Sequence, residues 1–270
     1  MQVIQCDACG GSVVYDAARE VASCVFCGSV AVHPEDLADA IAPPDQAVAF
    51  STTREQAAKA FAKWSRSSWW YPRELRDLSI ELCDVMLPAW RFDAELETHW
   101  AGLKKARTRS GMRPTSGVAR ATETIMVPAS LGLAAHELLA LEPFHTAAAQ
   151  PWDDPDADGT PMEVPSVTET AAEGLARTQL AERHRKAIAR QYKLGRCNGT
   201  SLATIDTTRL VMLPIWIGSF RYRDLPWRFV INAQTGQVTG KAPISRTKVA
   251  LAVVAGLVVA ALAAWWRSRG

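Results

Sequence analysis

The sequence lacks a strong net charge, and its first residues lack the pattern of a leader segment. Its 270 residues carry 30 Lys and Arg against 28 Asp and Glu, so the formal net charge is only +2. Dedicated nucleic-acid-binding domains are usually strongly basic, and this balance is not typical of them. The first residues, MQVIQCDACG, contain neither a charged segment nor an apolar one. We therefore expect no secretory signal.

The chain also lacks catalytic motifs. It has neither the Gly-Lys loop that cradles phosphates nor a GxGxxG segment, which excludes a P-loop helicase. Ser130 stands without a nucleophile motif, and the five His are scattered. Asp93, Glu95 and Glu97 alternate along a predicted strand and should face outward together, so an acid/base pair there is the enzymatic alternative. We expect a protein that is not an enzyme.

Cysteine is unevenly distributed, because four of the six lie within the first thirty residues. They form two CxxCG turns with fourteen residues between the pairs. Two such turns on facing hairpins place four thiolates around one point, which is the arrangement of a zinc ribbon. A matched pair of turns without a secretory signal favours metal binding over disulfides or a redox dithiol. The predicted Zn²⁺ ligands are Cys6, Cys9, Cys24 and Cys27.

Four protein ligands leave no coordination position for water, so the predicted zinc is structural and not catalytic. A module of this size buries too little apolar surface to fold alone, and metal binding of about 10 kcal/mol would stabilise it. His33 lies just beyond the module, and we expect it at the surface.

The longest apolar run is at the other end of the sequence, from Val249 to Trp266, and it contains no charge and no Pro. Roughly 20 apolar helical residues cross a ~30 Å hydrocarbon layer, so this run is long enough to span a membrane. Trp265 and Trp266 lie at one rim and cations flank both ends, as in spanning helices. A buried core helix is the alternative, but the run has no polar stripe.

The orientation of this span is predicted from the cysteines. Cations flank it in similar number on both sides, so the positive-inside rule does not decide. Thiolate ligands persist best in a reducing compartment, and a short tail is easily translocated. We expect a single-pass protein of the cell inner membrane, tail-anchored, with its amino-terminal body in the cytoplasm.

These patterns predict an α+β chain in four parts. A zinc ribbon at 1–30 is followed by a Pro-containing linker at 31–50, an α+β body at 51–245 and a transmembrane anchor at 246–270. The body should contain an antiparallel sheet, because alternating apolar residues recur along it.

Local patterns place the elements of the body. Trp90, Phe92, Ala94 and Leu96 alternate as in a half-buried strand. The segment Met-Leu-Pro-x-Trp occurs twice, beginning at 86 and at 212, which indicates a weakly duplicated strand unit. Apolar residues at helical spacing predict helices after the possible caps at 51–53 and over 73–83, 130–141 and 168–193.

Three polar segments leave alternatives open. The basic loop at 104–113 is a solvated hairpin tip or a contact with anionic headgroups. The basic helix at 183–196 is a solvated face or a contact with lipid or nucleic acid. The acidic loop at 153–158 resembles the start of a calcium loop, but Pro165 stands where an EF-hand has Glu.

Several segments carry a resemblance to a family. They are the two CxxCG turns, Leu87-Pro-x-Trp90-x-Phe92-Asp93, Val127-Pro-x-Ser130, Leu213-Pro-x-Trp216 and the hairpin from Phe229 to Pro243. With them the chain resembles bacterial membrane-anchored zinc-ribbon proteins, which are often labelled primosomal or helicase-like on the ribbon alone. Such proteins are similar to accessory components of flotillin-like (SPFH-domain) and phage-shock-protein-A-like membrane systems.

The resemblance implies an accessory role at the membrane. We expect a non-enzymatic adaptor or scaffold whose zinc ribbon recruits partners at the cytoplasmic face, with membrane lipid and a flotillin-like or phage-shock-like protein as partners and no small-molecule substrate. The alternative is nucleic-acid binding at the membrane through the ribbon and the basic 183–196 helix.

Overall fold

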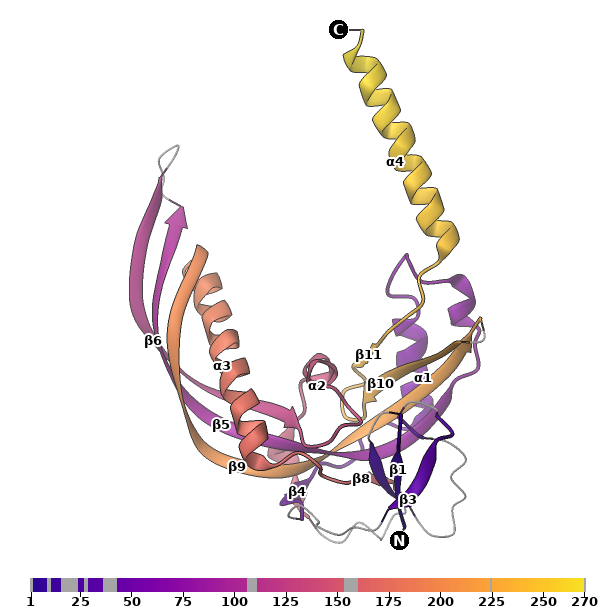
Figure 1. The fold of residues 1–270 in the computed structure, drawn as a ribbon, viewed down its shortest axis with the longest axis vertical. Coiled ribbons are helices and arrows are strands. Elements are labelled where there is room, and N and C mark those ends of the chain that lie inside the picture. The colour runs from indigo at the N-terminus through magenta and orange to yellow at the C-terminus, as the bar shows by residue number, and fades with distance from the viewer. Residues whose placement is uncertain are drawn as a thin grey trace.

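A computed structural model describes residues 2–8, 11–15, 24–26, 29–35, 43–105, 111–152, 160–223 and 225–269. Over these residues the chain forms four α-helices and a mixed sheet of eleven strands (Figure 1). The strands are β1 (Gln2–Cys6), β2 (Ser12–Tyr15), β3 (Val32–Glu35), β4 (Gln46–Ala47), β5 (Glu81–Lys105), β6 (Met112–Pro128), β7 (Gln150–Pro151), β8 (Met162–Glu163), β9 (Leu194–Tyr222), β10 (Leu225–Asn232) and β11 (Val238–Gly240). The helices are α1 (Arg54–Trp64), α2 (Ala135–Leu141), α3 (Glu169–Gln191) and α4 (Arg246–Arg267), with 3₁₀ turns η1 (Arg73–Arg76) and η2 (Thr146–Ala148).

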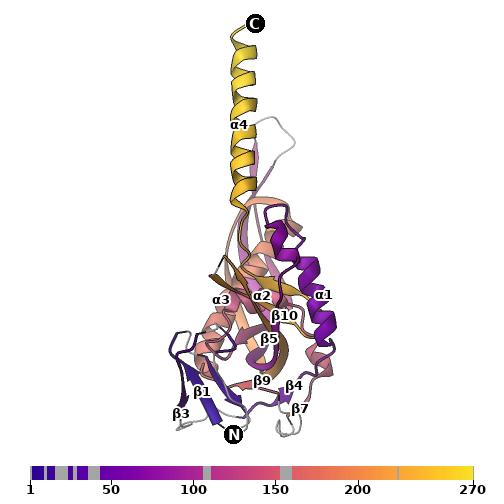
Figure 2. The same cartoon turned by 90° about the vertical axis from the view of Figure 1, so that its right-hand side faces the viewer.

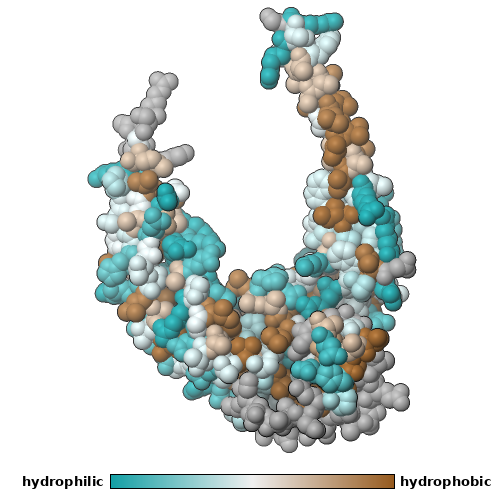
Figure 3. Space-filling model, in the orientation of Figure 1, coloured by the Kyte–Doolittle hydropathy of each residue, from teal (hydrophilic) through white to brown (hydrophobic). Residues whose placement is uncertain are grey.

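The molecule is U-shaped, and the long antiparallel pair of β5 and β9 runs through the whole of the U (Figure 1). One arm consists of the end of β5, β6 and the start of β9, with α3 along its inner side. The other arm consists of the start of β5, the end of β9, β10 and β11, with α1 packed on it. The space-filling view keeps the two arms well apart (Figure 3).

The strand pattern in β5 explains why α3 packs on it. Trp90, Phe92, Ala94 and Leu96 are all buried and alternate with less buried residues, which confirms the predicted half-buried strand. Successive side chains of a strand point to opposite faces, so these four share one face. The helix α3 covers that face and completes a hydrophobic core.

The repeated Met-Leu-Pro-x-Trp segments lie opposite each other in the sheet. Leu87 of β5 pairs directly with Leu213 of β9, and on either side Met86 pairs with Pro214 and Pro88 with Met212. The two copies therefore meet at the base of the U, and each continues into a different arm.

The two tryptophans of the repeat make equivalent contacts in their own arms. Trp90 Nε1 donates to the main-chain oxygen of Val167 at 2.8 Å, and Trp216 Nε1 donates to Thr52 Oγ1 at 3.1 Å. Each acceptor residue immediately precedes the N-cap of the helix that covers that arm. In each arm the tryptophan thus bonds to the residue before the helix cap, through a main-chain oxygen at Val167 and through a side-chain hydroxyl at Thr52.

Main-chain hydrogen bonds also match between the two arms. Ala129 N donates to Pro88 O at 2.9 Å, and Ala233 N donates to Pro214 O at 3.1 Å. The oxygens of Ala129 and Ala233 in turn each accept two N–H groups from the residues just before α3 and α1. An approximate local two-fold axis between Leu87 and Leu213 relates the two arms.

Two predictions about the body are wrong. The sheet is mixed and not simply antiparallel, because β4 runs parallel to β9 and β8 runs parallel to β5. Both are two-residue strands in connecting segments, too short to show alternation. The predicted helix over 73–83 is only the 3₁₀ turn η1, since Leu82 already pairs with Gly218 of β9 and the ladder overrides the helical spacing.

The helix α4 leaves the second arm at its tip. Among the described helices it alone is long and apolar enough to cross a membrane, and no residue in its apolar window is buried. Its outer surface is largely hydrophobic along its length (Figure 3). The two chain termini lie at opposite ends of the long axis of the molecule (Figures 1 and 2).

Candidate functional site

The candidate site is the amino-terminal module, by which we mean the described parts of residues 2–35. In it β1 pairs antiparallel with β2 on one side and with β3 on the other. The strand β3 lies inside the range 31–50 that the sequence predicts as a linker. Val3 of β1 and Val13 of β2 are buried, whereas Ile4, Ser12 and Val14 beside them are less buried, so one face of these strands is covered more than the other.

Both cysteine turns are closed in the same way. Cys6 N donates to Gly11 O at 3.0 Å, and Cys24 N donates to Ser29 O at 2.8 Å, so each bond links residue i to residue i+5. Phe26 N donates to the sulfur of Cys24 at 3.4 Å, which holds that thiol near the main chain of its own turn. Cys6 and Cys24 are both buried.

This donor set fits a metal-binding turn as far as it is described. Thiolate sulfurs that accept main-chain N–H groups are oriented as ligands by those bonds. Cys9 and Cys27 lie outside the described residues. Among the residues that are described, no group of three or more His, Cys, Asp or Glu could hold a metal. Zinc binding by Cys6, Cys9, Cys24 and Cys27 therefore stays a prediction.

His33 is exposed in β3, as predicted. Its Nδ1 lies 3.5 Å from Asp7 Oδ1, and both side chains are largely solvated. A solvated pair of this kind contributes little to the stability of the module, so we regard it as a surface feature.

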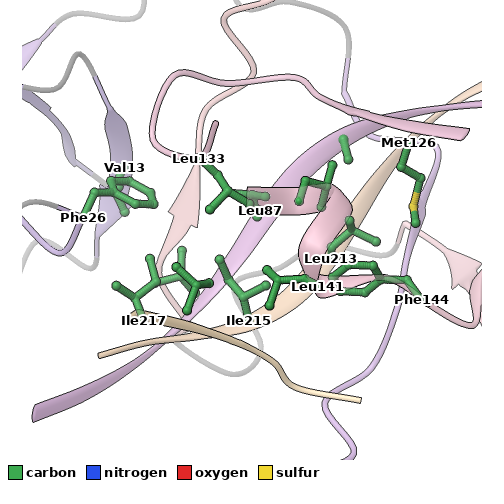
Figure 4. Close-up of a cluster of buried hydrophobic side chains, with 14 of the residues drawn as sticks. Val13, Phe26, Leu87, Met126, Leu133, Leu141, Phe144, Leu213, Ile215 and Ile217 are labelled. Atoms are coloured by element: carbon green, nitrogen blue, oxygen red, sulfur yellow. The ribbon is translucent and has the colours of Figure 1, made fainter. Parts of the chain in front are cut away.

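The module is joined to the body by a strand pair. In β2, Val13 lies opposite Glu163 of β8, and Val164 N donates to Ser12 O at 2.8 Å just beyond it. The buried ring of Phe26 and the side chain of Val13 face Leu133 of the body (Figure 4). The module thus shares both its sheet and its core with the body.

A buried carboxyl group lies at this junction. Glu163 Oε2 accepts from the hydroxyl of Ser130 at 2.6 Å, and Oε1 accepts from Gly132 N at 2.8 Å. Burial raises the pKa of Glu163 to about 7, against the opposing effect of these two hydrogen bonds and of the Arg228 charge. A Cβ at Gly132 would come within 2.8 Å of the Phe26 ring, so the close approach of loop and module requires glycine.

Arg228 connects four parts of the structure at the same junction. From β10 it donates to Gly132 O at 2.8 Å and to Phe26 O at 3.3 Å. Its Nη2 contacts both carboxylate oxygens of Glu137 in α2 at 2.6 Å. One guanidinium therefore ties the body sheet, α2 and the 130–133 loop to the module, through charge-assisted bonds.

The predicted outward carboxylates on β5 are occupied by separate neighbours. Asp93 accepts from Thr124 and Thr207 hydroxyls and from Arg91, and these bonds and the Arg91 charge outweigh its partial burial and lower its pKa. Glu97 accepts from Arg120 at 2.8 Å, with His99 Nε2 at 2.9 Å. On the outer face of this arm, Asp93 and Glu97 are therefore each hydrogen-bonded to different side chains.

The predicted basic helix at 183–196 is divided in the structure. The helix α3 ends at Gln191 and β9 begins at Leu194. Arg183 already lies 3.4 Å from Glu142 and 3.8 Å from Glu123, whereas Arg185 and Arg190 are exposed. Of the other polar segments, 106–110 and 153–159 lie outside the described residues.

Two buried polar clusters carry no clear sequence signal. Glu163 falls in a loop-like stretch, and its neighbours Ser130 and Gly132 are some thirty residues away in sequence. His184 bonds to Thr98 at 2.8 Å inside the α3 arm. Its position at the four-residue spacing of the buried stripe of α3 is a signal of burial, although not of its partner.

Comparisons with known proteins give a distant likeness. No protein-family model matches the chain, and no solved structure matches it. The chain is similar to the "Uncharacterized protein YdjG" of Bacillus subtilis (strain 168), with 25% identity over 228 residues. The match covers 77% of this chain and 66% of the relative, so the chain spans slightly less than two thirds of that protein's length.

Proposed function

We propose that the protein is a membrane-tethered, non-enzymatic adaptor. Its helix α4 anchors it in the cell inner membrane, and its amino-terminal module, held by zinc, recruits partner proteins in the cytoplasm. The observation that carries the proposal is the placement of these two parts at opposite ends of the molecule (Figures 1 and 2). A module at the end remote from the bilayer is accessible to partners that approach from solution.

Zinc would be held by Cys6, Cys9, Cys24 and Cys27. When bound, it supplies a four-coordinate crosslink between the two turns and no reactive position. The matching main-chain closures at Cys6 and Cys24 support this assignment, because equivalent turns present equivalent ligands. The body supports the module through β8 and Arg228, so a partner bound to the module is held at the body.

The kind of partner is inferred from the family resemblance. Proteins with these segments resemble accessory components of flotillin-like and phage-shock-protein-A-like systems, so we propose a membrane-associated protein of that kind as the partner. Nucleic acid is the weaker alternative, since Arg183 of the basic segment is already paired within the protein.

The test is co-purification of the full-length protein, solubilised in mild detergent, with a flotillin-like protein from the same cells. Replacing the four ribbon cysteines by Ser should remove both the bound zinc and most of the recovered partner, because the turns lose their crosslink. The matched control, Cys83→Ser with Cys197→Ser, should keep both. Equal partner recovery from the two variants would contradict recruitment by the module.

A further inference from the structure

We propose that a cationic pocket at the base of α4 binds the phosphate group of an anionic phospholipid. The inference rests on the proposed function only in taking α4 as the membrane anchor. It adds a ligand that is bound neither by the module nor by the apolar helix. It also gives the body a direct role in binding lipid headgroups.

The pocket has a volume of about 460 Å³, within the range of small-molecule sites. The turn after α1 and the 3₁₀ turn η1, which are neighbours in the sequence, form it together with the first turn of α4 from the far end of the chain. Its lining residues are Arg66, Ser68, Trp69, Arg73, Arg76 and Lys248.

Four of the six lining side chains are cations, and none is a carboxylate. Among the described residues, Arg66, Arg73 and Arg76 form no ion pair, whereas Arg91, Arg177 and Arg228 elsewhere are each paired with a carboxylate. Like charges repel, so an anion bound in the hollow would relieve their mutual repulsion. One guanidinium group can donate two parallel hydrogen bonds to two oxygens of a phosphate. Phosphate is therefore the anion that these arginines fit.

Lys248 fixes the pocket to the start of the membrane helix. Its Nζ donates to Trp69 O at 2.8 Å and to Tyr71 O at 2.7 Å, and it lies 5.5 Å from the centre of the Trp69 ring. Ser245 N donates to Trp70 O at 2.9 Å, just before α4 begins. These bonds hold the 66–73 segment beside the first turn of α4, which is where a spanning helix passes through the headgroups.

Two exposed indoles favour a lipid over a soluble phosphate compound. Trp69 is 57% exposed and Trp70 is 43% exposed, and they lie edge to face with ring centres 5.1 Å apart. Indole rings concentrate at the membrane interface, with the apolar body toward the chains and the N–H toward the headgroups. A pocket of cations bordered by such rings is suited to a phosphate that is already at the bilayer surface.

The experiment uses the full-length protein in neutral detergent and native mass spectrometry. Phosphatidylglycerol and phosphatidylcholine of the same chain length are added in equal amounts, and bound lipid is counted from the mass of the complex. We expect phosphatidylglycerol to be retained in preference. Equal retention of the two lipids would overturn the proposal.

A charge-matched pair of variants locates the site. Arg73→Gln with Arg76→Gln should weaken phosphatidylglycerol binding about thirtyfold, since each cation near an anionic surface is worth about fivefold. Arg185→Gln with Arg190→Gln removes the same charge from exposed positions of α3 and should leave binding unchanged. Equal weakening by both pairs would show a general charge effect and overturn the pocket.

Inorganic phosphate distinguishes the two sources of the anion. Bound phosphatidylglycerol should survive millimolar phosphate, whereas complete displacement would make a soluble phosphate compound the ligand and overturn the lipid assignment. Failure of the anchor is recognised separately. If the unmodified protein does not sediment with membranes, the proposed function fails, but if it sediments and shows no lipid preference, only this inference fails.

Discussion

The helices α3 and α4 differ by a single residue in length, yet their surroundings are opposite. In α3 five residues at four-residue spacing are buried against the sheet: Ala172, Ala176, Leu180, His184 and Ile188. In α4 no residue is buried, although almost every side chain is apolar. The comparison shows that a helix with one narrow apolar stripe is buried by the protein along that stripe, whereas a helix that is apolar over nearly its whole surface is left uncovered by it.

The small residues of α3 explain its close packing. Alanines at two successive positions of the buried stripe allow the helix axis to approach the sheet, and Arg177 on the flank donates to Ala203 O of β9. The remaining surface of α3 is mostly polar or charged and solvated, apart from the exposed Leu175 and small residues. Between Val249 and Trp266 α4 carries no charged side chain on any side, so a surrounding that is apolar on all sides suits it, and the lipid hydrocarbon layer is such a surrounding.

The largest expected effect breaks this comparison by giving α4 a polar stripe. Val254→Arg with Val258→Arg places two charges on one face near the middle of the helix, at a cost of about 5 to 7 kcal/mol for insertion. We expect the protein to move from the membrane pellet to the supernatant when lysed cells are centrifuged. Val254→Leu with Val258→Leu is the matched control and should stay in the pellet.

Thermal unfolding of the body provides the second readout for these variants. Because no α4 residue is buried in the protein, the midpoint should be the same for the wild type, the Arg variant and the Leu variant. A lower midpoint for the Arg variant would show that α4 packs on the body after all, and would contradict its role as an anchor.

The parts of the fold that the sequence predicts are those whose pattern is complete within one segment, as it is in α3 and α4. The helix α4 could be read from composition alone, and the predicted helix over 168–193 is close to the observed Glu169–Gln191 because its periodicity is complete. The parallel pairings of β4 with β9 and of β8 with β5 could not be predicted, since a strand of two residues is too short to show an alternating pattern. The register of Leu87 with Leu213 is set by tertiary pairing, although the repeat itself was visible in the sequence.

The sites divide similarly. The cysteine turns are local, so their spacing predicts a ligand set, whereas the junction around Glu163 and the pocket around Arg73 gather residues from separate segments. Lys248 reaches the pocket from the far end of the chain. Only the fold brings such residues together, and no pattern within one segment predicts their proximity.

The next effect compares the same side-chain change in the two helices. Leu180→Ala removes a fully buried side chain of α3 and should lower the free energy of unfolding by about 2 to 5 kcal/mol, because it leaves a cavity. Leu257→Ala removes the same atoms from an α4 position that is 67% exposed, and the body should lose less than about 0.5 kcal/mol.

Denaturant unfolding of the body, followed by tryptophan fluorescence in detergent, measures both variants. The membrane pellet assay should retain both, since Ala is tolerated in a spanning helix. Equal destabilisation by the two substitutions would contradict the distinction drawn between the helices.

The last and smallest effect is a pH dependence that the body should show and α4 should not. Glu163 has a folded-state pKa of about 7 against an ordinary value of 4.5, so the folded state holds this proton more tightly than the unfolded state. Its contribution to stability is complete below about pH 4.5 and is lost as the pH rises to about 7, by roughly 3 kcal/mol in all.

Glu163→Gln should flatten the slope of unfolding free energy against pH, whereas Glu182→Gln at an exposed position of α3 should keep it. Membrane retention should not change over this range, because the apolar stretch of α4 has no ionisable side chain. Unfolding titrations in which Glu163→Gln retained the wild-type slope would assign the pH dependence to other groups and remove the module junction from this comparison.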